Sequence, residues 1–406
     1  MSLKNAIGGV ALLAGTAIGA AVLALPVITA HLGLPQTIII YCICWLFMTF
    51  GALYILEVNL LVGYGTNLIS MAEKTLGNSG KYFTWVVYLI LLYALTSAYL
   101  SGVGAWLTQG FNHFNISISH FESALLATFL TMMVILLGTA VTDWMNRFLM
   151  IGLIGAFVTL LSVIFKHVDP QLLLAQASAI DLRPFPLIIT AFGSAIVVPT
   201  LTEYLHGKPK QLLYVVLIGS VIPLLVYITW ESAILGIIPL QGEGGLLYIQ
   251  KYGHAATDVT SALKSILHNQ LITSASMYFS IFALITSLLG VCLSLFDFLA
   301  DGLHVSKTFK TRLKLSLITF VPPLCFIIFF PKGFTFALSF AGIFVAILLG
   351  ILPAIMAWQG RYCLKEAKPL QIWGGKGMII LTITFFLLVG AIECFNQYEA
   401  LVKPHV

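Results

Sequence analysis

Two stretches of the chain place small residues in the middle of long apolar segments. The first reads AGTAIGAAVLALP over Ala14–Pro26, and the second reads ITAFGSAIVVPTLTEYL over Ile189–Leu205. Glycine and proline both weaken an α-helix. Where a helix is interrupted, its free N–H groups suit a carboxylate and its free carbonyls suit an ammonium group or a metal cation. A pair of interruptions can therefore bind a zwitterion without any ionised side chain.

Three interpretations of the first stretch compete. Gly15-xxx-Gly19 is the small-residue pattern that lets two helices pack closely. Pro26 alone could kink a continuous helix. The third interpretation is a discontinuous helix, which predicts a matching interruption in a later internal repeat. The residues Gly193, Ser194 and Ala195 supply that match.

The candidate binding groups follow from the third interpretation. Backbone groups of the first stretch would bind the carboxylate: Gly15, Thr16, Ala17, Ile18 and Gly19. Those of the second stretch would receive the ammonium group and side chain: Ala191, Phe192, Gly193 and Ser194. Hydroxyl groups at Tyr93, Thr96 and Tyr99 fall at i, i+3 and i+6, which predicts a polar stripe for the substrate or for bonds between helices.

The composition determines where these stretches lie. The chain has 406 residues, of which 60% are hydrophobic and only 9% are charged, and its mean hydropathy is +1.02. Since a soluble domain carries about 25% charged residues, the composition indicates an integral membrane protein. Its expected surroundings are lipid, and the sequence indicates no nucleic acid, cofactor, metal or obligate protein partner.

Apolar windows predict an all-α protein with eleven membrane spans. The expected spans are 6–30, 36–62, 84–110, 123–142, 147–166, 185–205, 211–238, 271–301, 313–330, 334–358 and 375–396. Residues 6–166 and 185–358 form two five-helix halves of one transporter domain over 1–406, each opening with an interruption. Because five is odd, the halves would be inverted repeats.

Basic residues predict the orientation. With a cytoplasmic N-terminus, 14 of the 20 Lys and Arg residues fall inside and 6 outside, as the positive-inside rule requires. The C-terminus is then expected on the periplasmic side. The long outer connection over 239–270 is expected to form either a lid or an inert helical hairpin.

Carboxylates within or beside the spans are the candidates for proton coupling. The order of preference is Glu57, then Asp297, then Glu231, because ionisable residues at membrane depth are costly and usually functional.

Short motifs along most of the chain carry a family resemblance. They are GTAIGA (15–20), LEVNL (56–60), YALTSAYLSGVG (93–104), NRFL (146–149), TSLLGVCLSLFDFLAD (286–301), ITFVPPL (318–324) and FPKGF (330–334). Together the motifs resemble the bacterial aromatic amino acid permeases, which look like part of the LeuT-type transporter group. The resemblance implies uptake of tyrosine or a related aromatic amino acid across the bacterial inner membrane by proton symport.

The resemblance has one departure and leaves the coupling ion open. Phe192-Gly193 is followed by Ser194-Ala195, where tyrosine permeases carry an aromatic residue and a histidine. LeuT-type sodium transporters bind a cation through a carbonyl and two hydroxyls, which correspond here to Ala283, Thr286 and Ser287. Sodium coupling is therefore the alternative.

Two other functional classes are disfavoured. A membrane-embedded enzyme would show a motif such as HExxH or GxSxG, and the sequence contains neither. A channel would show a repeated filter loop, and none is visible.

Overall fold

All regular elements in the described part of the chain are helices. The computed structural model describes residues 3–174, 181–205, 209–303, 309–329, 333–364 and 370–402. Several residues used to predict the orientation and the spans lie outside these ranges: Lys208, Lys307, Phe330, Lys332, Lys365, Lys368 and Lys403. The expectation of an all-helical chain is confirmed for the described residues.

The helices have the following bounds. In the first half they are α1 (Leu3–Ala17), η1 (Ala20–Leu23), α2 (Leu25–Thr29), η2 (Ala30–Leu32), α3 (Gly33–Val62), α4 (Leu68–His113), α5 (His120–Leu137), α6 (Thr139–Ile164), η3 (Phe165–His167) and α7 (Pro170–Leu174). From the middle of the chain they are α8 (Phe185–Ala191), η4 (Gly193–Val197), α9 (Val198–Leu205), α10 (Pro209–Leu235), α11 (Leu246–Tyr252), α12 (Ala255–Leu267) and α13 (Gln270–Gly302). The last are α14 (Phe309–Phe329), α15 (Gly333–Val345), η5 (Ala346–Ile351), α16 (Leu352–Trp358), η6 (Gln359–Cys363) and α17 (Gly375–Val402).

Ten segments of the described chain are long and apolar enough to cross a membrane, against eleven expected. The difference arises at the N-terminus, where helical residues run almost without a break over Ala20–Val62 and count as one segment of 43 residues. A shorter apolar helix, Asn5–Ala17, precedes it. The run turns at Gly33, whose φ of 70° is a left-handed conformation that glycine adopts readily.

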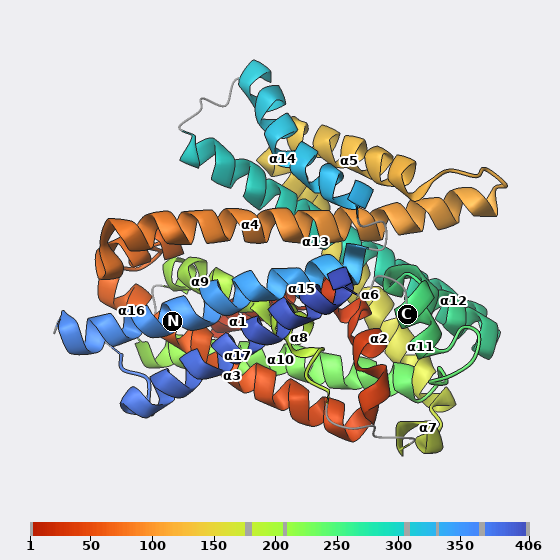
Figure 1. Cartoon of the computed structure of the whole chain (residues 1–406), viewed down its shortest axis with the longest axis horizontal. Helices are drawn as coiled ribbons and strands as arrows, with labels where there is room; N and C mark the ends of the chain where they lie inside the picture. Colours follow the sequence, from red (N-terminus) through yellow and green to blue (C-terminus); the bar gives the residue numbers. More distant parts are fainter. Residues whose placement is uncertain are drawn as a thin grey trace.

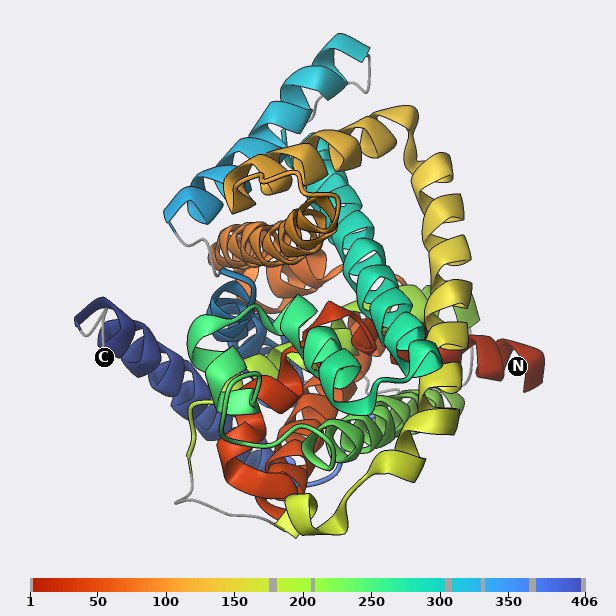
Figure 2. The same cartoon turned by 90° about the vertical axis from the view of Figure 1, so that its right-hand side faces the viewer.

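The long helix α4 divides the molecule. Helices α5 and α14 pack on one side of it, and α15 contacts it from the other (Figure 1). Helix α13 packs against α6, which borders the molecule in Figure 2. Helices α1, α3 and α10 pack together, and this group positions the first sequence stretch against the second.

The outer helices expose large apolar side chains. Phe329 on α14 is 76% exposed and Ile151 on α6 is 73% exposed. A water-soluble protein rarely exposes apolar surface so extensively, and hydrocarbon solvates such faces. The chain is therefore a multi-pass membrane protein, as the composition predicts.

The expected outer connection is a pair of helices. Helices α11 and α12 contact each other, and α12 packs on α13, α4 and η1. Because η1 belongs to the first sequence stretch, the helical pair lies directly over one of the two candidate interruptions.

Candidate functional site

The first stretch leaves the α-helical conformation between Ala17 and Leu25, a segment called here the first junction. Gly19 has an extended backbone, with φ −133° and ψ −160°. The N–H of Ala20 donates to Ser287 Oγ at 2.9 Å, so α13 caps the following turn. A Cβ at Gly19 would lie 2.7 Å from Ser287 Oγ, so a larger residue here would displace the hydroxyl that accepts from Ala20. Pro26 lies in the first turn of α2, where its missing N–H costs no helical bond.

The second stretch leaves the α-helical conformation over residues 192–197, the second junction. Helix α8 ends at Ala191, and the N–H of Ser194 donates to the carbonyl of Phe192 at 2.8 Å. A 3-10 turn follows, and α9 begins at Val198 next to Pro199. Both junctions thus place a tight turn ahead of a short helix that contains a proline in its first turn.

Tyr227 on α10 contacts both junctions. Its hydroxyl lies 2.6 Å from the carbonyl oxygen of Ala17 and 2.8 Å from that of Ala191. The ring of Tyr227 also packs edge-on against Phe192, at 5.0 Å between centroids, and against Tyr41. These three rings, Tyr41, Phe192 and Tyr227, form the aromatic trio, which covers both helix ends on one side.

A cavity of about 600 Å³ reaches both junctions from the other side. Many predicted residues line it: Gly15, Thr16, Ala17, Ile18, Gly19, Tyr99, Ala191, Gly193, Thr286 and Ser287. Its mouth lies on the side of the molecule where α1 begins, called here the N-side. There the ion-paired side chains of Asp143 and Arg147 are 55% and 77% exposed. The cavity has the size and the mixed lining typical of small-molecule sites.

Other predicted residues lie outside the cavity lining. Tyr93 donates to the carbonyl of Ile318 on α14 at 2.8 Å, and Thr96 donates within α4 to Leu92. Because an α-helix turns about 100° per residue, positions 93 and 99 differ by about 120° and do not share a face. Phe192 belongs to the aromatic trio, and neither Ser194 nor Ala283 contributes to the lining.

Sequence reasoning missed part of the α4 face. The cavity is lined by Tyr88, Leu91, Leu92, Leu95 and Tyr99, which follow an i, i+3, i+4, i+7, i+11 pattern. The signal was present in the sequence, since two tyrosines 11 residues apart fall on one helical face. Apolar residues between two phenols suit an aromatic ring with a polar end. Asn146 and Ser294 are further polar residues of the lining.

The hydroxyls of the alternative cation site are already hydrogen bonded. Thr286 Oγ1 donates to the carbonyl of Phe282 at 2.7 Å, and Ser287 Oγ accepts from Ala20. Both bonds are of the kind by which side-chain hydroxyls pack and cap helices.

Glu57 is part of a buried ion pair. Its carboxylate receives two hydrogen bonds from the guanidinium of Arg361 on η6, one of them 2.5 Å long from Nε, and a third from the N–H of Ile372 at 2.9 Å. The two residues are 5% and 4% exposed. These contacts join α3 to η6 and give Glu57 a structural role. Because its charge is neutralised by Arg361, Glu57 ranks below Glu231 as a candidate proton site.

The remaining carboxylates differ in their surroundings. Asp297 is half-buried on α13 and is not part of the cavity lining. Glu231 on α10 is fully buried, and hydroxyl groups of Thr29 and Tyr41 bond to it.

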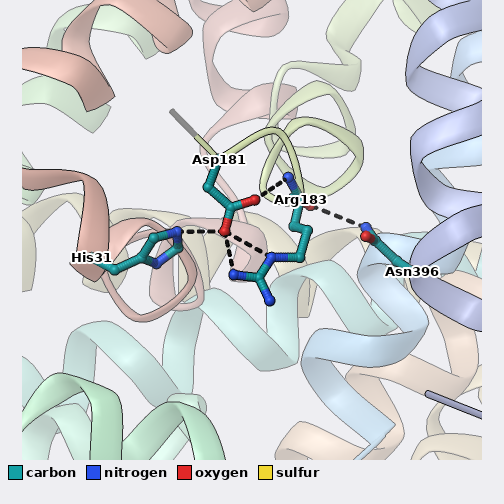
Figure 3. Close-up of polar contacts among 4 residues, drawn as sticks. All are labelled: His31, Asp181, Arg183 and Asn396. Atoms are coloured by element: carbon teal, nitrogen blue, oxygen red, sulfur yellow. Dashed lines mark hydrogen bonds and ion pairs between the residues drawn. The ribbon is translucent and has the colours of Figure 1, made fainter. Parts of the chain in front are cut away.

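A polar cluster lies on the side opposite the N-side. Asp181 Oδ2 is 2.7 Å from His31 Nε2 and accepts from Arg183 Nε at 2.7 Å, and Asn396 on α17 donates to the Arg183 carbonyl at 3.3 Å (Figure 3). Burial alone would raise the pKa of Asp181, but the hydrogen bonds from His31 and Arg183 lower it below its usual range. The Asp181 carboxylate therefore joins η2 to the segment before α8, and Asn396 joins that segment to α17 through the Arg183 carbonyl.

The lowered pKa of Asp181 leads to a pH prediction. A carboxylate with a lowered folded-state pKa adds stability above its unfolded value of about 3.9 and loses it as the pH falls through the folded value. In a His31→Gln background, the melting-temperature difference caused by Asp181→Asn should stay constant from about pH 5 to about pH 8 and shrink below about pH 4. A difference that changes between pH 5 and pH 8 would contradict it.

Comparisons with known proteins identify the family of the chain. Residues 2–393 match the model of the tryptophan/tyrosine permease family. The chain is 33% identical over 393 residues to tyrosine-specific transport system 1 of Haemophilus influenzae, covering 96% of each protein. It is 30% identical over 403 residues to the tryptophan-specific transport protein of Shigella flexneri, covering 96% of this chain and 95% of that one.

A solved structure shares the fold. The manganese transporter of Eremococcus coleocola superposes with a TM-score of 0.66 over 99% of this chain and 88% of that one, at 12% identity. The resemblance found in the sequence motifs is confirmed by the family model, and the relatives are transport proteins rather than enzymes. The chain belongs to the tryptophan/tyrosine permease family.

Proposed function

We propose that the protein imports tyrosine or a related aromatic amino acid by proton symport. The observation that carries this proposal is the cavity of about 600 Å³, which reaches both junctions and runs along a face of α4 bounded by two tyrosines. The names of the tyrosine- and tryptophan-specific relatives support an aromatic substrate.

The binding mode follows from the groups at the junctions. The substrate carboxylate would take N–H groups where the helical turn after Gly19 begins, since Gly19 and Ala21 line the cavity there. The ammonium group would approach the carbonyls of Ala17 and Ala191, which both lie within hydrogen-bond distance of the Tyr227 hydroxyl. The aromatic ring would lie along α4 between Tyr88 and Tyr99.

The proposed architecture is a LeuT-type domain with eleven membrane crossings. Helices α1–α2 and α8–α9 would each form one crossing, interrupted at its junction. Residues 6–166 and 185–358 would be the two inverted repeats, with 375–396 as the extra helix. Rocking of one helix group against the other would expose the site alternately to each side.

The proposed orientation places the N-side in the cytoplasm and the C-terminus in the periplasm of the bacterial inner membrane. The asymmetry of Lys and Arg residues supports it. In this orientation the cavity opens inward, and the cluster around Asp181 lies on the periplasmic side.

Uptake into proteoliposomes tests the proposal. Labelled tyrosine should accumulate above equilibrium when a proton gradient is imposed and not when a sodium gradient alone is imposed. Accumulation only with sodium would favour the alternative, in which carbonyls near Gly15 and Ile18 join Ala283, Thr286 and Ser287. Absence of uptake of any aromatic amino acid would refute the substrate class.

Tyr99 is expected to contribute to side-chain selectivity. A site that bonds the hydroxyl of its substrate rejects analogues lacking it, and a single neutral hydrogen bond contributes about 0.5–1.5 kcal/mol. Tyr99→Phe should therefore lower the ratio of tyrosine to phenylalanine uptake several-fold, up to about tenfold. Tyr214→Phe is the matched control, because Tyr214 is 62% exposed on α10. An unchanged ratio in Tyr99→Phe would show that Tyr99 does not contribute to side-chain selectivity.

A further inference from the structure

Glu231 lies closer to the substrate site than its place near the end of α10 suggests. It is fully buried and follows Tyr227 by four residues, so both side chains lie on one face of α10. Tyr227 in turn holds the carbonyls of Ala17 and Ala191. A single helical turn therefore separates the Glu231 carboxyl from the residue that joins the two junctions.

The two oxygens of Glu231 are bonded only by hydroxyl groups among the described residues. Oε1 is bonded to the hydroxyl of Thr29 on α2, and Oε2 accepts from the hydroxyl of Tyr41 on α3 at 2.7 Å. The titratable group that bonds to Glu231 among the described residues is Tyr41 from α3, and Tyr227, on the same helix as Glu231, packs against the Tyr41 ring. The ion pairs found among the described residues do not include Glu231.

A count of hydrogens favours a protonated carboxyl at this position. The Thr29 hydroxyl has one hydrogen but lies within bonding distance of both Glu231 Oε1 and the carbonyl of Leu25, 2.7 Å away. If Glu231 carries a proton on Oε1, it donates to Thr29, and Thr29 donates to Leu25. If Glu231 is ionised, one of the two acceptors loses its hydrogen bond, and a charge without a cation is left in a buried site, which is costly.

The other buried glutamates of the described chain, Glu57 and Glu393, lack this arrangement. Glu57 is neutralised by Arg361. Glu393 on α17 accepts amide hydrogens from Asn396 and Gln397 of its own helix. Glu231 alone among these three is bonded to a residue of the first crossing and linked through rings to both junctions.

The contacts of Tyr227 and Tyr41 connect the proton to the substrate. The Tyr41 ring packs edge-on against Phe192 and Tyr227, so a change at the carboxyl alters the packing at the second junction. The Tyr227 hydroxyl has one hydrogen for two carbonyls, whereas a substrate ammonium group has three. The ammonium can therefore take both carbonyls and release Tyr227, one turn away from Glu231.

We propose that the Glu231 carboxyl carries the proton transported with the amino acid, and that Tyr227 is the positioning residue that couples this proton to the substrate's ammonium group. When the proton is bound, the Thr29 hydroxyl and the Leu25 carbonyl both have hydrogen-bond partners. Both residues belong to the first crossing, which would move during transport. Release of the proton to the other side leaves Glu231 ionised and destabilises that set of contacts. The inference rests on the proposed function and deepens it by naming the coupling group.

The test separates accumulation from exchange in proteoliposomes. Glu231→Gln should lose accumulation of tyrosine under a proton gradient, with the ratio of inside to outside concentration falling to about 1. Exchange of labelled against unlabelled tyrosine at equal pH should persist and become independent of pH. Glu243→Gln, in an exposed loop, is the control for loss of a negative charge. Continued accumulation by Glu231→Gln with a wild-type pH profile would overturn the proposal.

Two further variants keep the test decisive if Glu231→Gln neither accumulates nor exchanges. Glu231→Asp retains a titratable group, so a displaced pH profile of accumulation supports the proposal and an unchanged profile overturns it. Tyr227→Phe should displace the pH profile of exchange, whereas Tyr214→Phe should not, and equal profiles would overturn the role of Tyr227. Failure of the wild type to accumulate aromatic amino acids with protons would instead refute the proposed function.

Discussion

Glu57→Gln is expected to destabilise the protein by about 3–5 kcal/mol, because it removes one partner of a buried ion pair and leaves the other charge without compensation. The guanidinium of Arg361 is 4% exposed, and water has little access to it in the folded protein. Glutamine also offers one acceptor oxygen in place of two, so it cannot keep all the hydrogen bonds that the carboxylate accepts from Arg361 and from the N–H of Ile372. A large fall in the melting temperature of the detergent-solubilised protein is the expected result.

The matched control for this prediction is the double variant Glu57→Gln/Arg361→Gln. With both charges removed, the loss of stability should be clearly smaller than the sum of the two single losses, since coupled residues are not additive. Additive losses would contradict the ion-pair interpretation. A stable Glu57→Gln protein with a flattened pH profile of uptake would instead restore Glu57 as a proton site.

Gly51→Ala is expected to prevent correct packing of α3 against η5. A Cβ at Gly51 would lie 2.0 Å from the carbonyl oxygen of Leu349, and this neighbour is backbone that has no rotamer to change. Overpacking usually costs about 1–3 kcal/mol, and a contact this short with backbone should exceed that range. Because Leu349 also lines the cavity, the shift should reach the site.

Expression and monodispersity by size-exclusion chromatography measure this effect. Gly155→Ala is the control, since Gly155 lies in α6 with no atom within 4 Å of the added Cβ. The control should be as stable as the wild type or up to about 1 kcal/mol more stable, because alanine favours helix. Normal yield and melting temperature of Gly51→Ala would contradict this prediction, because they would show that α3 and η5 can move apart without loss of stability.

Glycine and proline act locally, and for this reason the sequence alone can indicate candidate interruptions. Helix α1 ends at Ala17 and α8 ends at Ala191, and residues on both sides of these ends were candidates. The face of α4 is harder to predict, because hydroxyls at i, i+3 and i+6 turn progressively around the helix and do not mark one face. Tyr88 and Tyr99 became visible as a pair only when the cavity was known.

The contact partners of the buried carboxylates could not be predicted from the sequence. Arg361 lies 304 residues from Glu57, and no local pattern joins them. The hydroxyls that bond to Glu231 come from α2 and α3, and Tyr227 was not a candidate at all, since a tyrosine in a long apolar helix carries no local signal. Long-range contacts of this kind depend on how the helices pack, which periodicity alone does not determine.

The one-sided opening of the cavity has a consequence for energy conservation in the cell. On the N-side the path from solvent to the junctions is open, whereas the aromatic trio and the cluster around Asp181 cover the opposite side. A continuous water path through the protein would require both barriers to open together. While no substrate is bound, the Tyr227 hydroxyl contacts carbonyls at both junctions, so we expect a double opening to be disfavoured and ion leakage to be low in the empty protein.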